Sequence, residues 1–161
     1  MDTFLAIASK RDVRAYADAS IPDDVQQRIL DAGRVAGSAQ NRQDREFVIV
    51  ERAQQELAQA VFAPRNVATA RFVVAIVGPA RPFDVGRAAQ NMMLAAWNDG
   101  VASCPNGVRD AETADRICGG EVKMILSFGY AAKPRDPTTR SPGEWSARAN
   151  RRPLDELVRR V

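Results

Sequence analysis

Three short runs of apolar residues, separated by segments with helical spacing, most constrain the fold of this 161-residue chain. The runs are residues 46–50 (EFVIV), 71–78 (RFVVAIVG) and 121–130 (EVKMILSFGY). Nearly continuous apolar runs of this length are typical of strands buried on both faces of a sheet. Because the length suits one domain with one hydrophobic core, the interleaved strands and helices predict a single α/β or α+β domain.

Two longer segments between these runs have the pattern of amphipathic helices. In residues 21–37, Pro22 lies near the expected start, acidic residues occupy the first turn, and Gly37 ends the helix. The second helix is expected to begin with Asp84 as its N-cap and to stop at Gly100. Shorter helices are expected before Lys10, over 53–62, after an Asp110 cap and near 152–160, whereas the Pro- and Arg-rich residues 131–149 are expected to be irregular.

The chain contains no histidine, and this absence limits the possible chemistry. It excludes Ser-His and Cys-His catalysis and makes a zinc site unfavourable. Cys104 and Cys118 are too few for a disulfide framework and belong to no CxxC pair, which favours thiols in a reducing compartment. With neither a signal peptide nor a membrane span expected, the chain is interpreted as cytoplasmic. If it is an enzyme, a bound cofactor carries the reaction.

Basic residues gather just beyond the first helix, where Lys10, Arg11 and Arg14 fall within five positions. Cations this close repel one another unless an anion or solvent separates them, so a phosphate is one interpretation. A solvated turn is the other. Arg151 and Arg152, near the end of the chain, form a second basic pair that is either a phosphate contact or a solvated tail.

The polar loop before the first strand is a further candidate. Ser38, Asn41 and Gln43 carry neutral donors and acceptors suited to a heteroaromatic ring or a polyol, while Gly37 and Ala39 allow close approach to the backbone. An ordinary helix-to-strand loop is the alternative. Residues 100–107 (GVASCPNG) have the pattern of a turn, whose exposed amides either cradle a ligand or merely reverse the chain.

In this order, the segments KRDVRAY, IPDDVQQRILDAGRVAGSAQNRQ, DVGRAAQNMMLAAWNDGVAS, ILSFGY and RRPLDEL resemble the nitroreductase family of FMN-dependent oxidoreductases, from Phe4 to Val158. The resemblance implies an α+β fold with a central mixed β-sheet flanked by helices. Residues 1–161 would be one domain, and residues 131–161 would be an arm that wraps the partner of a homodimer. Two FMN molecules at the interface would carry hydride from NADH or NADPH to nitro compounds, quinones or related small-molecule acceptors in a ping-pong cycle.

The resemblance also assigns cofactor-binding residues, although no side chain is expected to be catalytic because the flavin carries the chemistry. Lys10 and Arg11 would lie near the phosphate and ribityl chain, with Arg14 nearer the pyrimidine edge. The remaining assigned residues are Asp12 in the same basic motif, Ser38, Ala39, Asn41 and Gln43 reaching across the dimer, Pro105, Asn106 and Gly107 under the flavin N5 edge, and Arg151 at the phosphate with Arg152 as the alternative register.

Two other functions stay open. Asp12 stands where the family often has Ser, and the segment between Gly78 and Asp84 is short, which suits a flavin-binding or sequestering protein without efficient turnover. A nucleic-acid-binding protein is the weaker alternative, because the basic residues alternate with acids and no aromatic platform is present. We therefore expect neither a nucleic-acid nor a membrane partner.

Overall fold

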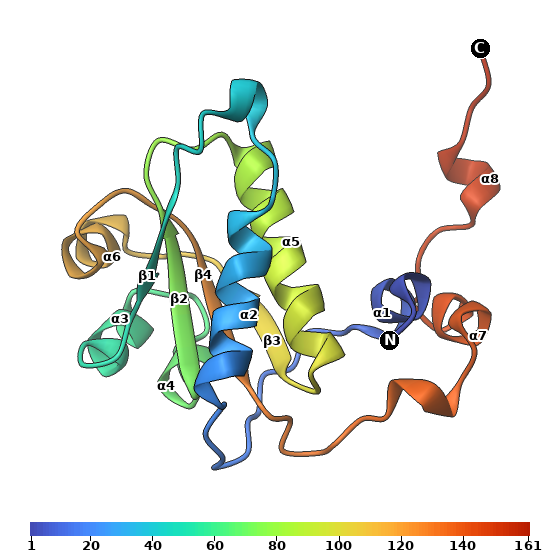
Figure 1. Cartoon of the computed structure of the whole chain (residues 1–161), viewed down its shortest axis with the longest axis horizontal. Coiled ribbons are helices and arrows are strands. Elements are labelled where there is room, and N and C mark those ends of the chain that lie inside the picture. Colours follow the sequence, from blue (N-terminus) through green and yellow to red (C-terminus); the bar gives the residue numbers. More distant parts are fainter. The chain divides into compact units, whose positions relative to one another are not determined.

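The computed structural model describes residues 1–161 and divides them into two compact units. The larger unit comprises residues 11–135, and the smaller unit comprises residues 1–10 together with residues 136–161. Figure 1 shows the helices and strands of each. None of the helices has both the length and the apolar character needed to span a membrane.

A four-stranded sheet with the order β1-β2-β4-β3 forms the centre of the larger unit. Its strands are β1 Glu46–Ile49, β2 Phe72–Val77, β3 Ala102–Asn106 and β4 Val122–Gly129. β1, β2 and β4 coincide with the three apolar runs, and the α+β class is confirmed.

The sheet is antiparallel throughout, so the expected mixed sheet is wrong. Helix α5, Pro82–Asn98, connects β2 to β3, and these two strands run in the same direction. They are not neighbours in the sheet. β4 fills the gap and is antiparallel to both neighbours. A parallel pairing does occur at the isolated bridge between Asp12 and Ser103, outside the four strands.

β3 lies where the sequence predicted a turn. Pro105 cannot donate a backbone hydrogen bond, but β3 is an edge strand, and edge strands tolerate proline because one side of the strand needs no partner. The glycines of the segment flank the strand: Gly100 has a φ of +76° after α5, and Gly107 follows Asn106. The turn residues therefore delimit a strand and do not replace it.

Alternate residues of β2 enter two hydrophobic clusters, one on each face of the sheet, where one core was expected. Val74 and Ile76 pack with α2, Asp23–Arg34, and with α5, which lies beside α2 in Figure 1. Val73 and Ala75 pack on the other face, where the helices are α3 Gln54–Gln59, α4 Pro64–Ala68 and α6 Ala111–Cys118. This alternation follows from the two-residue period of a strand.

The start of α5 and the end of α3 differ from the expected boundaries. α5 begins at Pro82, so Asp84 is not its N-cap; the Asp84 carboxylate accepts a hydrogen bond from Ala39 N at 3.2 Å instead. The helix expected over residues 53–62 ends at Gln59, because Val61 pairs with Val108, and α4 follows separately. The Asp110 cap of α6 is confirmed, since its side chain accepts from Thr113 N at 3.1 Å.

Residues 131–149 were expected to be irregular, but part of this range forms helical structure in the smaller unit. Its elements are α1 Thr3–Ser9, the 3-10 turn η2 Pro137–Thr139, α7 Pro142–Ala147 and α8 Leu154–Leu157. α7 forms because Ser141 and Glu144 make a capping box around Pro142, which stands at the first helical position. α1 packs against α7, and α8 confirms the expected helical turn near the end.

Two glycines provide a matched test of this backbone. Gly119 ends α6 with a φ of +72°, whereas Gly86 lies within α5, and an added Cβ would meet nothing within 4 Å at either position. We expect Gly119→Ala to destabilise the chain by about 1 kcal/mol and Gly86→Ala to stabilise it by up to about 1 kcal/mol. Urea unfolding measures both, and equal shifts would show that α6 does not end in a left-handed residue.

Candidate functional site

A cleft of about 520 Å³ opens in the larger unit beside β3. Its walls come from three parts of the chain that are distant in sequence: the segment after α1, the start of α4, and the segment after β4. The lining residues are Asp12, Val13, Arg14, Ala15, Arg65, Asn66, Ala132, Lys133 and Arg135. This volume is ordinary for a small-molecule site.

Backbone pairing of residues 12–17, here called the N-terminal strip, brings these parts together. At one end of the strip, Val13 N donates to Ser103 O of β3 at 3.1 Å. Further along, Ala132 N donates to Ala15 O at 2.9 Å, which fixes the segment after β4 beside the strip. Arg14 and Lys133 therefore reach the same cleft from neighbouring backbone segments.

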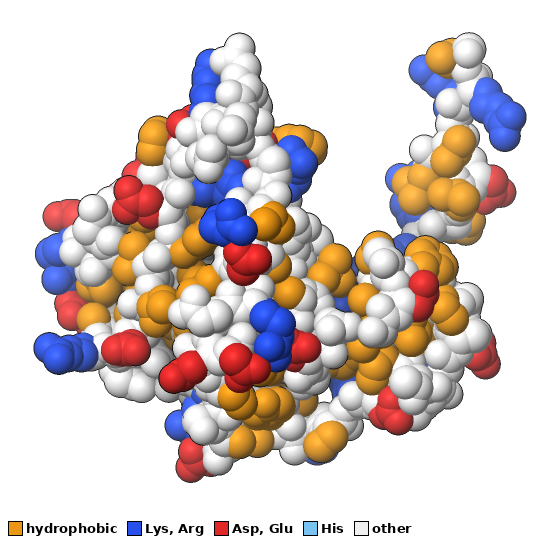
Figure 2. All heavy atoms as spheres, in the orientation of Figure 1, with side chains coloured by type: hydrophobic (Ala, Val, Ile, Leu, Met, Phe, Trp, Pro, Cys, Tyr) orange, Lys and Arg blue, Asp and Glu red, His pale blue; other side chains and the backbone are white.

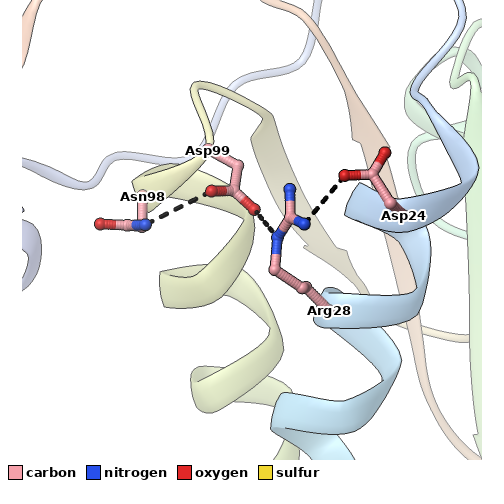
Figure 3. A network of polar contacts seen from close by, with 4 residues as sticks. All are labelled: Asp24, Arg28, Asn98 and Asp99. Carbon is pink, nitrogen blue, oxygen red and sulfur yellow. Dashed lines mark hydrogen bonds and ion pairs between the residues drawn. The ribbon is translucent and has the colours of Figure 1, made fainter.

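The cleft is lined by four cations, and none of them makes an ion pair within the chain: Arg14, Arg65, Lys133 and Arg135. Some arginines elsewhere in the chain do form ion pairs. Arg28 on α2, for example, lies between Asp24 at 2.9 Å and Asp99 at 2.8 Å, and so links α2 to the end of α5 (Figure 3). Unpaired cations around a cavity favour binding of an anion. We call this site the cationic cleft.

Asp12 also lines the cationic cleft and is its one acidic residue. Its backbone pairs with Ser103, so the position of Asp12 is set by the sheet edge. The carboxylate offsets part of the positive charge, which bears directly on how strongly an anion binds there.

A buried polar network lies behind the cleft and joins the strip to β3 and β4. Asn106 is 3% exposed, and its Nδ2 donates to Cys104 O at 3.0 Å, Ser127 Oγ at 3.1 Å and Ile125 O at 3.3 Å. The Tyr16 hydroxyl donates to Ser127 O at 3.0 Å. Although Asn106 Oδ1 has no hydrogen-bond partner, the bonds made by its Nδ2 and by the Tyr16 hydroxyl lie away from water and hold the strand ends in one arrangement.

Burial raises the pKa of the Tyr16 phenol well above its usual value, although its hydrogen bond to Ser127 opposes the shift. The folded chain therefore keeps this proton when the unfolded chain loses it, near pH 10. The stabilising contribution of Tyr16 is complete below about pH 10 and falls as the pH rises further.

We expect Tyr16→Phe to lower the free energy of unfolding by about 1 kcal/mol at neutral pH, because the hydrogen bonds to Ser127 are lost. The variant should also lose less stability between about pH 10 and pH 11 than the unmodified chain does, because the titrating phenol is gone. Urea unfolding across this range measures the difference. Identical alkaline losses would show that Tyr16 is not buried.

The loop from Gly37 to Gln43 has strained backbone. Gln40, Asn41 and Gln43 have φ values of 56°, 53° and 57°, a region that side chains other than glycine rarely adopt. Ser38 closes the loop, since its Oγ accepts from Gln43 N at 2.9 Å. Strain of this kind persists only where neighbouring structure enforces it and is concentrated at functional sites.

The strand register places this loop and the cationic cleft at opposite ends of the sheet. The loop leads into Glu46, which is opposite Val77, whereas the strip lies beside Ser103, which is opposite Phe128. In Figure 1 the loop, with its 3-10 turn η1 (Ala39–Asn41), is at the top of the larger unit. Within one chain, Ser38, Ala39, Asn41 and Gln43 are therefore not brought to Arg14.

The other expected site residues are divided between β3 and the smaller unit. Pro105 has no amide hydrogen, so of the three residues 105–107 only Asn106 and Gly107 can offer one. Lys10 follows α1 in the smaller unit, and Arg11 begins the larger one. In the smaller unit, Arg151 Nη1 donates to Ala149 O at 2.9 Å and Arg152 pairs with Glu156 at 3.3 Å.

Several lining residues were not foreseen from the sequence. They are Arg65, Asn66, Lys133 and Arg135. Arg65 and Asn66 lie in α4, shortly before β2, and Lys133 and Arg135 lie shortly after β4. This position near the ends of two strands was the one signal that the sequence offered for them. That signal could not locate the site as long as β3 was not predicted, because Asn66 is positioned by β3: its Nδ2 contacts Cys104 Sγ at 3.8 Å.

This fold is that of a nitroreductase-like α+β protein. A family model described as "Putative TM nitroreductase" matches residues 2–160, and the chain belongs to this nitroreductase family. No curated protein matches the sequence.

Solved structures of family members show the same fold. A Streptococcus pneumoniae TIGR4 nitroreductase family protein has 14% identity and a TM-score of 0.85 over 99% of this chain and 100% of its own. A Desulfovibrio desulfuricans protein described as a "putative nitroreductase" and solved in complex with FMN has 22% identity and a TM-score of 0.82 over 98% of this chain and 96% of its own. A nitroreductase family protein from Clostridium difficile 630 has 20% identity and a TM-score of 0.81 over 99% and 98%.

Proposed function

We propose that this protein is an FMN-dependent oxidoreductase that takes hydride from NADH or NADPH and passes it to a nitroaromatic, quinone or related acceptor in a ping-pong cycle. The observation that carries the proposal is the cationic cleft, in which four unpaired cations converge in a chain of the nitroreductase family. The FMN complex of the Desulfovibrio relative supports flavin as the cofactor. The cytoplasm, where thiols stay reduced, is the proposed location.

The residues of the cleft fit the chemistry of FMN. Arg11 directly precedes the N-terminal strip and is proposed to hold the phosphate with Lys10 and Arg151. Arg14 is proposed to face the pyrimidine edge, where a cation stabilises the negative charge that a reduced flavin gathers around N1 and the C2 oxygen. Bound FMN would supply the hydride acceptor and donor, so the chain needs to contribute no acid or base.

A homodimer would bring the loop Gly37–Gln43 of one chain to the cationic cleft of the other. Because the loop Gly37–Gln43 and the cationic cleft lie at opposite ends of one sheet, a single chain does not present both to one flavin. We propose that Ser38, Asn41 and Gln43 of one chain reach the flavin held by the other. We also propose that residues 1–161 act as one domain and that the arm, residues 131–161, lies on the partner beyond Arg135, since residues 131–135 belong to the larger unit.

Exposed apolar side chains near the loop support this assembly. Val35 is 60% exposed and Phe83 is 74% exposed, and both line a second cavity of about 610 Å³ between the end of α2 and the start of α5. Figure 2 shows apolar side chains (orange) at the surface among charged ones. Exposed apolar surface of this kind marks an interaction site. Sedimentation should give twice the 17.6 kDa of one chain.

Anaerobic stopped-flow mixing tests the proposed reaction. FMN-loaded protein mixed with NADPH or NADH should lose the visible absorbance of oxidised flavin, and a second mixing with a quinone should restore it. Flavin that stays oxidised with both nucleotides would contradict the oxidoreductase and favour the second candidate, a flavin-binding protein without turnover. That candidate is motivated by Asp12, whose carboxylate in the cleft opposes the extra negative charge of reduced flavin.

A further inference from the structure

The flavin contacts proposed above leave three cations of the cleft unassigned. Under the proposed function, Lys10, Arg11 and Arg151 hold the phosphate, and Arg14 faces the pyrimidine edge. Arg65, Lys133 and Arg135 remain, and we call these three the cationic rim. Each is exposed and lines the cleft, and none is ion-paired within the chain.

The rim is held in place by the backbone. Lys133 and Arg135 flank Pro134, whose ring fixes its φ, and the preceding residue Ala132 is tethered to Ala15 by a 2.9 Å hydrogen bond. Arg65 stands in α4, where Asn66 beside it is 6% exposed and contacts Cys104. Like charges placed together on two anchored segments repel one another until an anion binds between them.

The two candidate reductants differ in the anion that such a rim would recognise. NADPH carries a 2′-phosphate monoester that NADH lacks, and a phosphate monoester has a charge of about −1.5 to −2 at pH 7. Guanidinium groups match phosphate oxygens with two parallel hydrogen bonds, and a lysine adds a point charge. We propose that Arg65, Lys133 and Arg135 form a phosphate subsite that makes this protein prefer the 2′-phosphorylated nucleotide.

The proposal rests on the proposed function for its biological meaning, but its binding test does not need the flavin. Isothermal titration calorimetry would compare adenosine 2′,5′-bisphosphate with adenosine 5′-monophosphate on the unmodified full chain. We expect the bisphosphate to bind at least about 10-fold more tightly, and this advantage to shrink as salt is added. Equal affinities for the two nucleotides would overturn the proposal.

A rim variant, Arg65→Gln, Lys133→Gln and Arg135→Gln combined, should lose that advantage. The matched control removes the same charge away from the cleft, with Arg52→Gln, Arg109→Gln and Arg116→Gln combined, and should keep it. Loss in both variants would mean that net charge alone governs binding and would overturn the proposal. Calorimetry with 4-nitrobenzoate, an acidic nitroaromatic, tests the other use of the rim. If the rim variant loses 4-nitrobenzoate binding but keeps the preference for the bisphosphate, the rim binds an acidic acceptor and the proposal is overturned.

The FMN-loaded protein provides the second measurement. The apparent Kd for NADPH in flavin reduction should be at least about 10-fold below that for NADH, and the two should become similar in the rim variant while the limiting rate of reduction stays unchanged. If the chain takes up no FMN but the calorimetric preference is present, the proposed function fails and the phosphate subsite stands. If flavin is reduced equally well at equal concentrations of both nucleotides, the subsite fails and the oxidoreductase stands.

Discussion

Replacing Arg14 by glutamate should weaken FMN binding by at least about 100-fold. The substitution removes one of the four unpaired cations of the cleft and adds a second carboxylate next to Asp12. A charge-assisted hydrogen bond is worth about 1.5–3 kcal/mol, and the new carboxylate sets acceptor oxygens against the N1 and C2-oxygen acceptors of the pyrimidine edge, which adds to the loss. Quenching of FMN fluorescence on titration with apoprotein measures the change.

Arg52→Glu is the control for this experiment. Arg52 is exposed, lies between β1 and α3, and is not part of the cleft, so the same change of charge should alter FMN affinity less than about threefold. Similar losses in the two variants would assign the effect to net charge and would remove Arg14 from the site.

Asn106→Asp should lower the free energy of unfolding by about 3–5 kcal/mol. The Asn106 amide nitrogen donates to three oxygen acceptors, and the substitution places a carboxylate oxygen against all of them in a site that is 3% exposed. Because two of these bonds, to Ile125 and Ser127, join β3 to β4, hydrogen exchange in residues 102–106 should accelerate more than exchange in β1. Urea unfolding gives the total effect.

The same chemical change at Asn91 is the matched control. Asn91 is exposed on α5, where its amide donates to Ala32 O at 3.3 Å. Water can replace that bond, so Asn91→Asp should cost less than about 1 kcal/mol. A small effect at both positions would show that the network around Asn106 is open to water.

The strands of the sheet were predictable where burial is two-sided and continuous, as in Val73 to Val77 of β2. β3 was not predictable, because Pro105 is acceptable only on an edge strand, and a sequence does not show which strand is at the edge. α7 had a local signal, the capping pair Ser141 and Glu144, which the surrounding prolines and arginines obscured.

The candidate site also contains both residues that could be predicted from the sequence and residues that could not. Arg14 belongs to a local cluster of cations and could be singled out from its neighbours alone. Arg65 and Arg135 join it only through the pairing of the strip with β3 and with Ala132, which is set by tertiary structure. The strain in the loop was also hidden, because the polarity of Gln40 and Gln43 does not reveal a positive φ.

The visible absorption spectrum of the purified protein provides the most direct test of flavin binding. We expect a yellow protein that releases FMN when it is denatured, or an apoprotein that becomes yellow and retains the colour after gel filtration when FMN is added. A colourless protein that also fails to bind added FMN would contradict the proposed function.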